Sequence, residues 1–371
     1  MAKIKKTITM IVILTVMVLL TVGCEDTTTT TEVFPDGSCK RTVVVKSNTD
    51  EIFNDAFPVP RDPSWTVKGK WEKTGRKKTI SAKEYRYTAE KVFSDVSDLN
   101  QEFSLPDKEG DSAKIDIRVK LEKHFDGFFI TFHYREIYRE FFPFKGVPLS
   151  EYFTPDELKI LKLHIENKKK SEEINLGEIL EKLEDRFDTW MARSLFEEIY
   201  RCMVEAAERF KDPHLTPGFI ASHKEELFAV ISDDDSGLFD RSPVVPRILK
   251  EFGKILQNPD VIKLQEFNKQ EFDRFEEKLQ SFNGLIFDEY TNIVIMPGLI
   301  TDTNSEIITG NKVKWKFDAL EFLLRDHEMW VKSRLVNWWM VGIAILVVIL
   351  AVLGLIAGVL RKRRNTFLER T

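Results

Sequence analysis

Alternating apolar and polar residues predict β-strands in the first part of the chain and again near its end. The clearest alternation is Ile115, Ile117, Val119 and Leu121, which continues after His124-Phe125-Asp126-Gly127 through Phe128, Ile130, Phe132 and Tyr134. A period of two on both sides of a Gly-containing turn predicts a β-hairpin with one buried face. Shorter alternating runs around Val43 and around Trp315 predict strands in both flanks.

Between these flanks the apolar period becomes that of an α-helix. Thr154-Pro155-Asp156-Glu157 is a capping box with Pro at the first helical position, and apolar residues recur at helical spacing from about 177 to 210. Asn258-Pro259 begins a further helix that ends near Asn283-Gly284. We therefore predict an α+β fold, in which an antiparallel β-sheet domain built from both flanks is interrupted by a large helical insertion. Two consecutive domains are the alternative.

Two long apolar runs lie at the ends of the chain. Residues 338–360 contain no charge and would form a helix of roughly 34 Å, which exceeds a hydrocarbon core of about 30 Å. The run begins with Trp338 and Trp339, which suit the membrane interface, and it is followed by Arg361-Lys362-Arg363-Arg364. We expect one transmembrane helix with its C-terminal end in the cytoplasm.

The N-terminal run has the order of an export signal: Lys3, Lys5 and Lys6, then apolar Ile8–Val22, then Gly23 and Cys24. The stretch Leu20-Thr21-Val22-Gly23-Cys24 resembles a bacterial lipobox, and the resemblance implies that Cys24 is lipidated and becomes the mature N-terminus. An ordinary signal peptide and an uncleaved anchor are the alternatives.

These patterns divide the chain into seven segments. We predict a signal peptide (1–23), a Thr-rich spacer (24–39), a β-rich part (40–147), a helical insertion (148–284), a β-rich part that completes the sheet (285–337), the transmembrane helix (338–360) and a basic cytoplasmic tail (361–371).

Composition supports a folded, exported body. The chain has 371 residues, 43% of them hydrophobic, and a net charge of −5 although both termini are basic, so the body between them is acidic. An acidic body argues against nucleic acid as a partner. Cys39 and Cys202 would remain if Cys24 is lipidated, and the sequence leaves open whether they form a disulfide or are two buried free thiols.

The end of the chain resembles a known family. Met296-Pro297-Gly298, Thr303-Asn304-Ser305 and Gly310-Asn311-Lys312-Val313-Lys314-Trp315, followed by a strand and a span with basic flanks, are similar to the membrane-proximal part of bacterial LppM-type lipoproteins. The resemblance implies a lipoprotein signal, a β-rich exported domain with helices and a single C-terminal helix. It also implies an apolar or lipid ligand.

The sequence contains no motif that indicates catalysis, and we expect no enzyme activity, no cofactor and no metal site. An acidic loop at Asp233-Asp234-Asp235 lacks the ligand spacing of a calcium-binding loop. A dense aromatic stretch begins at Phe128. Core packing explains it, and the functional alternative is an apolar ligand cavity lined by Phe128, Ile130, Phe132 and Tyr134.

We therefore expect a single-pass protein of the cytoplasmic membrane, part of the bacterial cell envelope, with an extracytoplasmic body that is periplasmic or at the cell surface. The expected role is to bind an apolar or lipid ligand or an envelope protein partner. A structural or assembly role and an envelope hydrolase with an unrecognised site are the alternatives. Gly354 and Gly358 form a GxxxG pair in the span, which would permit a homodimer.

Overall fold

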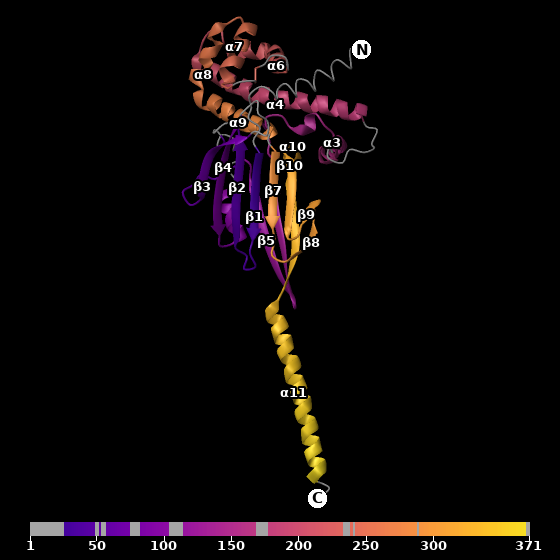
Figure 1. Ribbon diagram of the computed structural model, residues 1–371. Coiled ribbons are helices and arrows are strands. Elements are labelled where there is room, and N and C mark those ends of the chain that lie inside the picture. The colour runs from indigo at the N-terminus through magenta and orange to yellow at the C-terminus, as the bar shows by residue number, and fades with distance from the viewer. Residues whose placement is uncertain are drawn as a thin grey trace.

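The computed structural model describes residues 26–48, 52, 57–74, 82–103, 114–167, 177–232, 238–239, 242–287 and 289–368. Two β-sheets form a sandwich that carries a helical domain at one end and a long C-terminal helix at the other (Figure 1).

The larger sheet has seven strands in the order β3-β4-β2-β1-β7-β10-β9. They are β1 (Asp26–Val33), β2 (Cys39–Ser47), β3 (Thr66–Thr74), β4 (Ala82–Phe93), β7 (Glu289–Ile295), β9 (Ile307–Thr309) and β10 (Lys312–Asp318). The smaller sheet has the order β5-β6-β11-β8 and consists of β5 (Ile117–Asp126), β6 (Phe129–Tyr138), β8 (Leu299–Thr303) and β11 (His327–Val336). Three short helices accompany the sheets: η1 (Val96–Leu99), α2 (Asn100–Phe103) and α10 (Leu320–Leu323).

The helical region lies between β6 and β7 in the chain. It consists of η2 (Leu149–Glu151), α3 (Pro155–Asn167), α4 (Gly177–Phe210), α5 (Pro217–Ser222), α6 (Lys224–Ile231), α7 (Val245–Ile255), η4 (Pro259–Lys263), α8 (Leu264–Phe267) and α9 (Lys269–Phe287). The predicted capping box is present at the start of α3, where the Glu157 carboxylate accepts hydrogen bonds from the backbone N–H and the hydroxyl of Thr154, each at 2.9 Å.

The predicted α+β fold class is confirmed, including the sheet built from both flanks and the apolar C-terminal helix. The predicted hairpin is the pair β5 and β6, which turns at Gly127. One pairing differs from the prediction. Strand β1 is antiparallel to β2 but parallel to β7, so the larger sheet is mixed. It is this parallel pairing that joins the N-terminal flank to the strand that follows the helical region.

The Thr-rich segment is a central strand, so the prediction of a spacer over 24–39 is wrong for residues 26–33. Side chains alternate along β1, and Thr27, Thr29 and Thr31 are buried. Thr is β-branched and suits a strand, and its small hydroxyl can be buried where a partner accepts or donates a hydrogen bond. The sequence suggested a linker because the run is polar, whereas its β-branching was the better signal.

The molecule has two hydrophobic cores. One fills the space between the sheets, with Val43, Tyr87, Phe132 and Val331 among its buried members. The other lies among the helices and includes Phe142, Trp190 and Phe252.

The two cores meet at a junction. Phe141 belongs to the sheet core and its neighbour Phe142 to the helical core. On α10, Phe322 likewise belongs to the sheet core and Leu323 to the helical core. The backbone N–H of Phe141 donates a hydrogen bond of 2.9 Å to the carbonyl of Phe322. The helical domain is therefore attached to the sandwich by packing and by backbone pairing as well as by its chain connections.

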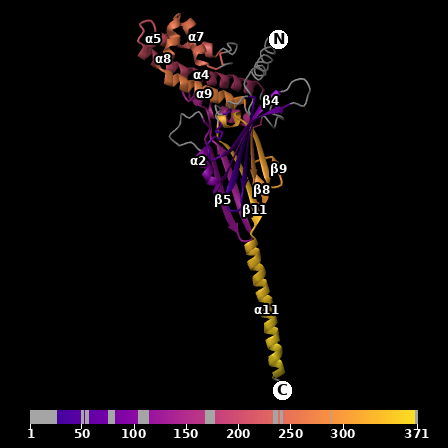
Figure 2. The same cartoon turned by 60° about the vertical axis from the view of Figure 1, so that its left-hand side comes forward.

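Strand direction places the helical domain and the C-terminal helix at opposite ends of the sandwich. Strand β7 leaves α9 at the helical end, and the parallel pairing puts Asp26 opposite Glu289 at that same end. Strand β11 runs from His327 at the helical end to Val336 at the other, where α11 (Trp338–Leu368) begins (Figures 1 and 2). The N-terminal strand thus starts far from the C-terminal helix.

Helix α11 is long and apolar enough to cross a membrane over Trp338–Gly358, and none of this stretch is buried against the rest of the protein. One residue separates it from β11. The backbone N–H of that residue, Asn337, donates a hydrogen bond of 2.8 Å to the carbonyl of Phe128 in the turn between β5 and β6. The helix is therefore joined to the sheet without a flexible linker.

Candidate binding cleft

A polar cleft of about 660 Å³ opens between α4 and α9 in the helical domain. Its lining residues are Arg201, Glu205, Arg209, Phe267, Asn268, Lys269, Gln270, Glu271 and Arg274. Four of these are basic and two are acidic, so the lining has a net positive charge.

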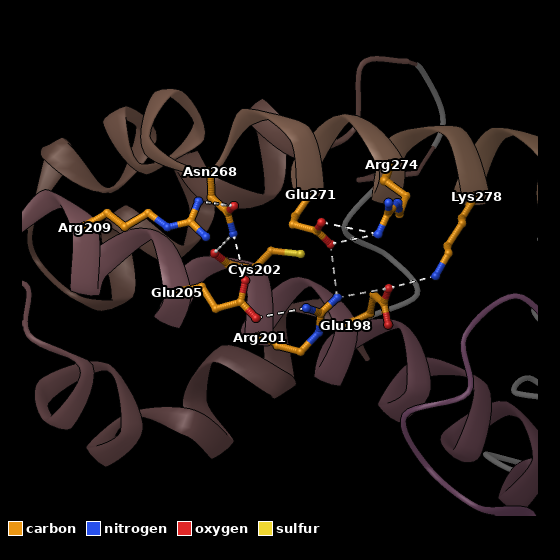
Figure 3. A network of polar contacts seen from close by, with 9 residues as sticks. All are labelled: Glu198, Arg201, Cys202, Glu205, Arg209, Asn268, Glu271, Arg274 and Lys278. Atoms are coloured by element: carbon orange, nitrogen blue, oxygen red, sulfur yellow. Dashed lines mark hydrogen bonds and ion pairs between the residues drawn. The ribbon is translucent and has the colours of Figure 1, made fainter. Parts of the chain in front are cut away.

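The two helices present these side chains because their apolar and polar residues occupy different faces. Cys202 and Phe275 are buried in the helical core. Glu198, Arg201 and Glu205 follow one another at spacings of three and four on α4, as do Glu271, Arg274 and Lys278 on α9. Such spacing brings side chains onto one stripe of a helix, and here the two stripes face each other (Figure 3).

Arg201 is the centre of the ion-pair network in Figure 3. Its guanidinium donates to Glu205 at 2.9 Å on its own helix and lies 3.5 Å from Glu198 and 3.5 Å from Glu271. Glu271 also lies 3.3 Å from Arg274, one turn further along α9. The network therefore ties α4 to α9 across the floor of the cleft.

Asn268 closes one end of the cleft and is 3% exposed. Its side-chain oxygen accepts a hydrogen bond of 2.7 Å from Arg209, and its amide nitrogen donates to the carbonyl of Cys202 and to the Glu205 carboxylate, each at 3.2 Å. At the other end, Lys278 is almost completely buried and lies 3.0 Å from Glu198. Both ends are fixed by hydrogen bonds between residues distant in sequence.

The thiol of Cys202, next to the network, is unreactive at neutral pH. Burial raises the pKa of Cys202 to about 12, so the side chain is a neutral thiol at neutral pH. A neutral buried thiol is neither a nucleophile nor a ready metal ligand. Within the described residues, no group of three or more His, Cys, Asp or Glu side chains is placed to hold a metal ion.

A second, smaller cavity of about 480 Å³ lies beside the larger sheet, between the segment 58–65 and α2. Glu102 of α2 accepts hydrogen bonds there from the indole of Trp65 and from the ammonium of Lys91. These contacts fix α2 against the strands, and the cavity is partly apolar, with Pro58, Val59 and Phe103 in its lining.

The residues that the sequence suggested as an apolar ligand lining are distributed between core and surface. Phe132 and Tyr134 are fully buried in the sheet core, Ile130 packs against that core, and Phe128 is 48% exposed at the hairpin turn. None of the four lines either cavity described above. Their arrangement is that of ordinary core packing, apart from Phe128.

Cys39 and Cys202 are both buried free thiols, so the disulfide that the sequence left open is not formed. Cys39 lies in the sheet core and Cys202 in the helical core, which explains why they do not meet. Cys24 and the acidic loop at 233–235 lie outside the described residues. Gly354 and Gly358 lie on α11, and a Cβ atom added at either would meet open space.

The sheet core contains a buried ion pair that sequence reasoning did not find. Arg41 of β2 and Glu136 of β6 are both 0% exposed, and two hydrogen bonds of 2.6 and 3.1 Å connect the guanidinium to the carboxylate. The same carboxylate accepts hydrogen bonds of 2.8 Å from the Tyr134 hydroxyl and from Asn292. Arg41 also donates to the hydroxyl of Thr31 on β1.

The surroundings of this pair keep it charged. Burial opposes ionisation of Glu136, but the charge of Arg41 and the hydrogen bonds from Arg41, Asn292 and Tyr134 outweigh burial and hold the pKa of that carboxyl below its ordinary value. Burial likewise opposes the charge on Arg41, and Glu136 more than compensates, so its pKa is raised. The pair links the two sheets through their centre.

No protein-family model matches the chain, and no curated protein matches it. One solved structure that does match is the NMR structure of the folded domain of the LppM protein of Mycobacterium tuberculosis. The match covers 85% of this chain and 94% of that chain at 10% identity, with a TM-score of 0.26.

Proposed function

We propose that this is a single-span membrane protein that holds a partner-binding helical domain at a fixed distance from the bilayer. The observation that carries the proposal is the placement of the helical domain and the apolar helix α11 at opposite ends of one rigid sandwich. The proposed role is binding and is not catalysis.

The anchor is the best supported part of this function. A 21-residue apolar stretch that makes no buried contact with its own protein requires another apolar environment, and a bilayer supplies it. The basic residues Arg361–Arg364 after the span favour a cytoplasmic C-terminus and an extracytoplasmic body.

The sandwich acts as a spacer in this proposal. Strand β11 alone has ten residues, which corresponds to about 33 Å at roughly 3.3 Å per residue. The direct junction at Asn337 and the packed junction around Phe141 and Phe322 leave neither end of the spacer loosely attached. The helical domain is therefore displayed well beyond the headgroups.

The cleft between α4 and α9 is the proposed binding surface. The positive lining suits carboxylate or phosphate groups, and the side chains of Arg201 and Arg274, although paired with Glu271, are 48% and 44% exposed to such a group. The expected partner is thus an acidic segment of another envelope protein. An apolar ligand, the other role considered from the sequence, has less support, since the cleft is mostly polar and the aromatic residues pack in cores.

A photo-crosslinker at Gln270, whose side chain is exposed in the cleft, tests this function in membranes that carry the full chain. We expect a discrete adduct that is lost in Arg274→Glu and kept in Arg274→Lys. The matched control is a crosslinker at Ile262, which is also exposed in the helical domain but does not line the cleft. Adducts of the same size at both positions, unaffected by the charge reversal, would contradict the proposal.

A further inference from the structure

The end of the sandwich next to α11 is unusually apolar for a surface. Phe125, Phe128 and Phe129 surround the turn between β5 and β6 and are 67%, 48% and 39% exposed. Val336, the last residue of β11, pairs with Phe129 and is 37% exposed. We call these four residues the apolar tip.

Both faces of the hairpin end carry an exposed aromatic ring, Phe125 on one and Phe129 on the other. Phe125 pairs with Ile130 on one face, whereas Phe129 pairs with Val336 on the other. A strand beside water on one side normally alternates apolar and polar residues. Phe128, Phe129 and Ile130 are three successive apolar residues that break this alternation, so apolar side chains reach both faces of the tip even though Asp126 lies opposite Phe129.

The position of the apolar tip identifies what covers it. Asn337 donates a backbone hydrogen bond to Phe128 and a side-chain hydrogen bond of 3.3 Å to the carbonyl of Gly127, and the next residue begins α11. The tip is therefore fixed beside the first turn of the span, where Trp338 and Trp339 are 74% and 84% exposed. Trp and Phe rings at that level belong in the interfacial zone of a bilayer.

The charged groups next to the tip fit the same environment. The ammonium of Lys123 lies 5.6 Å from the centre of the Phe125 ring, and the guanidinium of Arg334 lies 5.2 Å from that of Phe129. Both cations stand on the side of the tip toward the sandwich, at the level of lipid phosphates if the rings are immersed. Asp126 is the acidic residue of the turn, and its carboxylate accepts a hydrogen bond from Thr131.

We propose that the apolar tip inserts into the interfacial region of the bilayer that α11 crosses, so that the protein is held by a span and a second, hairpin contact. This inference rests on the proposed membrane span of α11. The second contact prevents the sandwich from tilting about Asn337 and keeps the helical domain upright.

Site-directed spin labels on the full chain in vesicles of phosphatidylethanolamine and phosphatidylglycerol test the inference. Labels are placed at Phe128→Cys and Phe125→Cys in a background that lacks Cys24 and keeps the two buried thiols. The control in the helical domain is Ile262→Cys, since Ile262 is 44% exposed and Phe128 is 48% exposed. A label at Leu350→Cys reports separately on the span. Collision with oxygen, which is enriched in lipid, is compared with collision with a water-soluble nickel complex.

The expected result is that the tip labels lie about 5–10 Å below the headgroup boundary, favour oxygen over nickel, and differ from Ile262. A tip label that favours nickel while Leu350 favours oxygen overturns the inference and leaves the span intact. A Leu350 label in water removes the span and the inference together. Tip labels shielded from both reagents, together with disulfide dimers of the unlabelled Phe128→Cys variant, would show that a second copy covers the tip and would also overturn it.

Discussion

The buried pair Arg41–Glu136 offers a quantitative prediction about what holds the two sheets together. In Glu136→Gln the side chain keeps its shape but loses its charge, which leaves Arg41 charged and completely buried without its counter-ion. Removing one partner of a buried ion pair typically costs about 3–5 kcal/mol. Since every 1.4 kcal/mol is roughly a factor of ten, the open population of the sandwich should increase by roughly two to three and a half orders of magnitude.

The two buried thiols provide an assay that separates the sandwich from the helical domain. Cys39 lies in the sheet core and Cys202 in the helical core, and burial raises the pKa of each to about 12, so labelling requires local or global opening. Mass spectrometry of peptides after thiol alkylation of the full chain in detergent measures each rate. We expect Glu136→Gln to accelerate labelling of Cys39 far more than that of Cys202.

A double variant distinguishes loss of the counter-ion from loss of packing. Arg41→Met with Glu136→Leu removes both charges and keeps apolar volume, so it should be much less destabilised than the sum of the single changes. Additive effects, or a less than tenfold change for Glu136→Gln, would refute the claim that the charge pair organises the core.

The pH dependence of Cys39 labelling, which reports opening of the sandwich, tests the contribution of the Glu136 charge to stability. Because the pKa of Glu136 is lowered by folding, its contribution to stability is complete above the ordinary value of 4.5 and is lost as the pH falls through the lower, folded-state value. Corrected for thiolate concentration, opening of the wild-type sandwich should therefore increase in acid. Glu136→Gln should lack this part of the acid dependence.

Three further changes test local features. Gly298→Ala, at a φ of +82° with its added Cβ 2.2 Å from a backbone carbonyl of β11, should destabilise the sandwich in Cys39 labelling by more than Gly310→Ala. The latter has a positive φ but open space and should cost about 1–2 kcal/mol. Hydrogen bonds from Thr154 lower the pKa of Glu157 to about 2. The Glu157 carboxylate should therefore stabilise the start of α3 above pH 4.5 and lose that effect toward pH 2. Hydrogen exchange in Glu157→Gln should not show this loss. Cys24→Ser should leave the protein in the membrane fraction, because α11 is the anchor.

The prediction for Cys24→Ser has a geometric basis. Cys24 precedes Asp26 by two residues, so the two Cα atoms can be at most about 7 Å apart. Asp26 lies at the helical end of the sandwich, and α11 begins at the other. A lipid on Cys24 could not reach the bilayer that α11 crosses while the sandwich stands upright. If Cys24→Ser released the chain from membranes, the claim that α11 alone anchors the protein would be wrong.

The sequence was sufficient to predict individual helices and strands, whereas contacts between elements distant in the chain could not be predicted from it. The β5–β6 hairpin, the helical region and α11 follow from periodicity, turn residues and length. Strand β1 was missed because its five Thr residues are polar, although they are β-branched. The Arg41–Glu136 pair joins residues 95 positions apart, and the cleft depends on α4 facing α9, so neither leaves a local signal.

The spacing of the helical domain from the bilayer is the central claim, and a distance measurement tests it directly. A fluorescent donor at Gln270→Cys on the full chain in nanodiscs is paired with acceptor-labelled lipid headgroups. With the sandwich upright, a ten-residue strand of about 33 Å separates the helical domain from the headgroups, so the donor should lie at least about 30 Å above them. A donor found within about 15 Å, less than half the length of that strand, would mean that the sandwich lies on the membrane and would contradict the account.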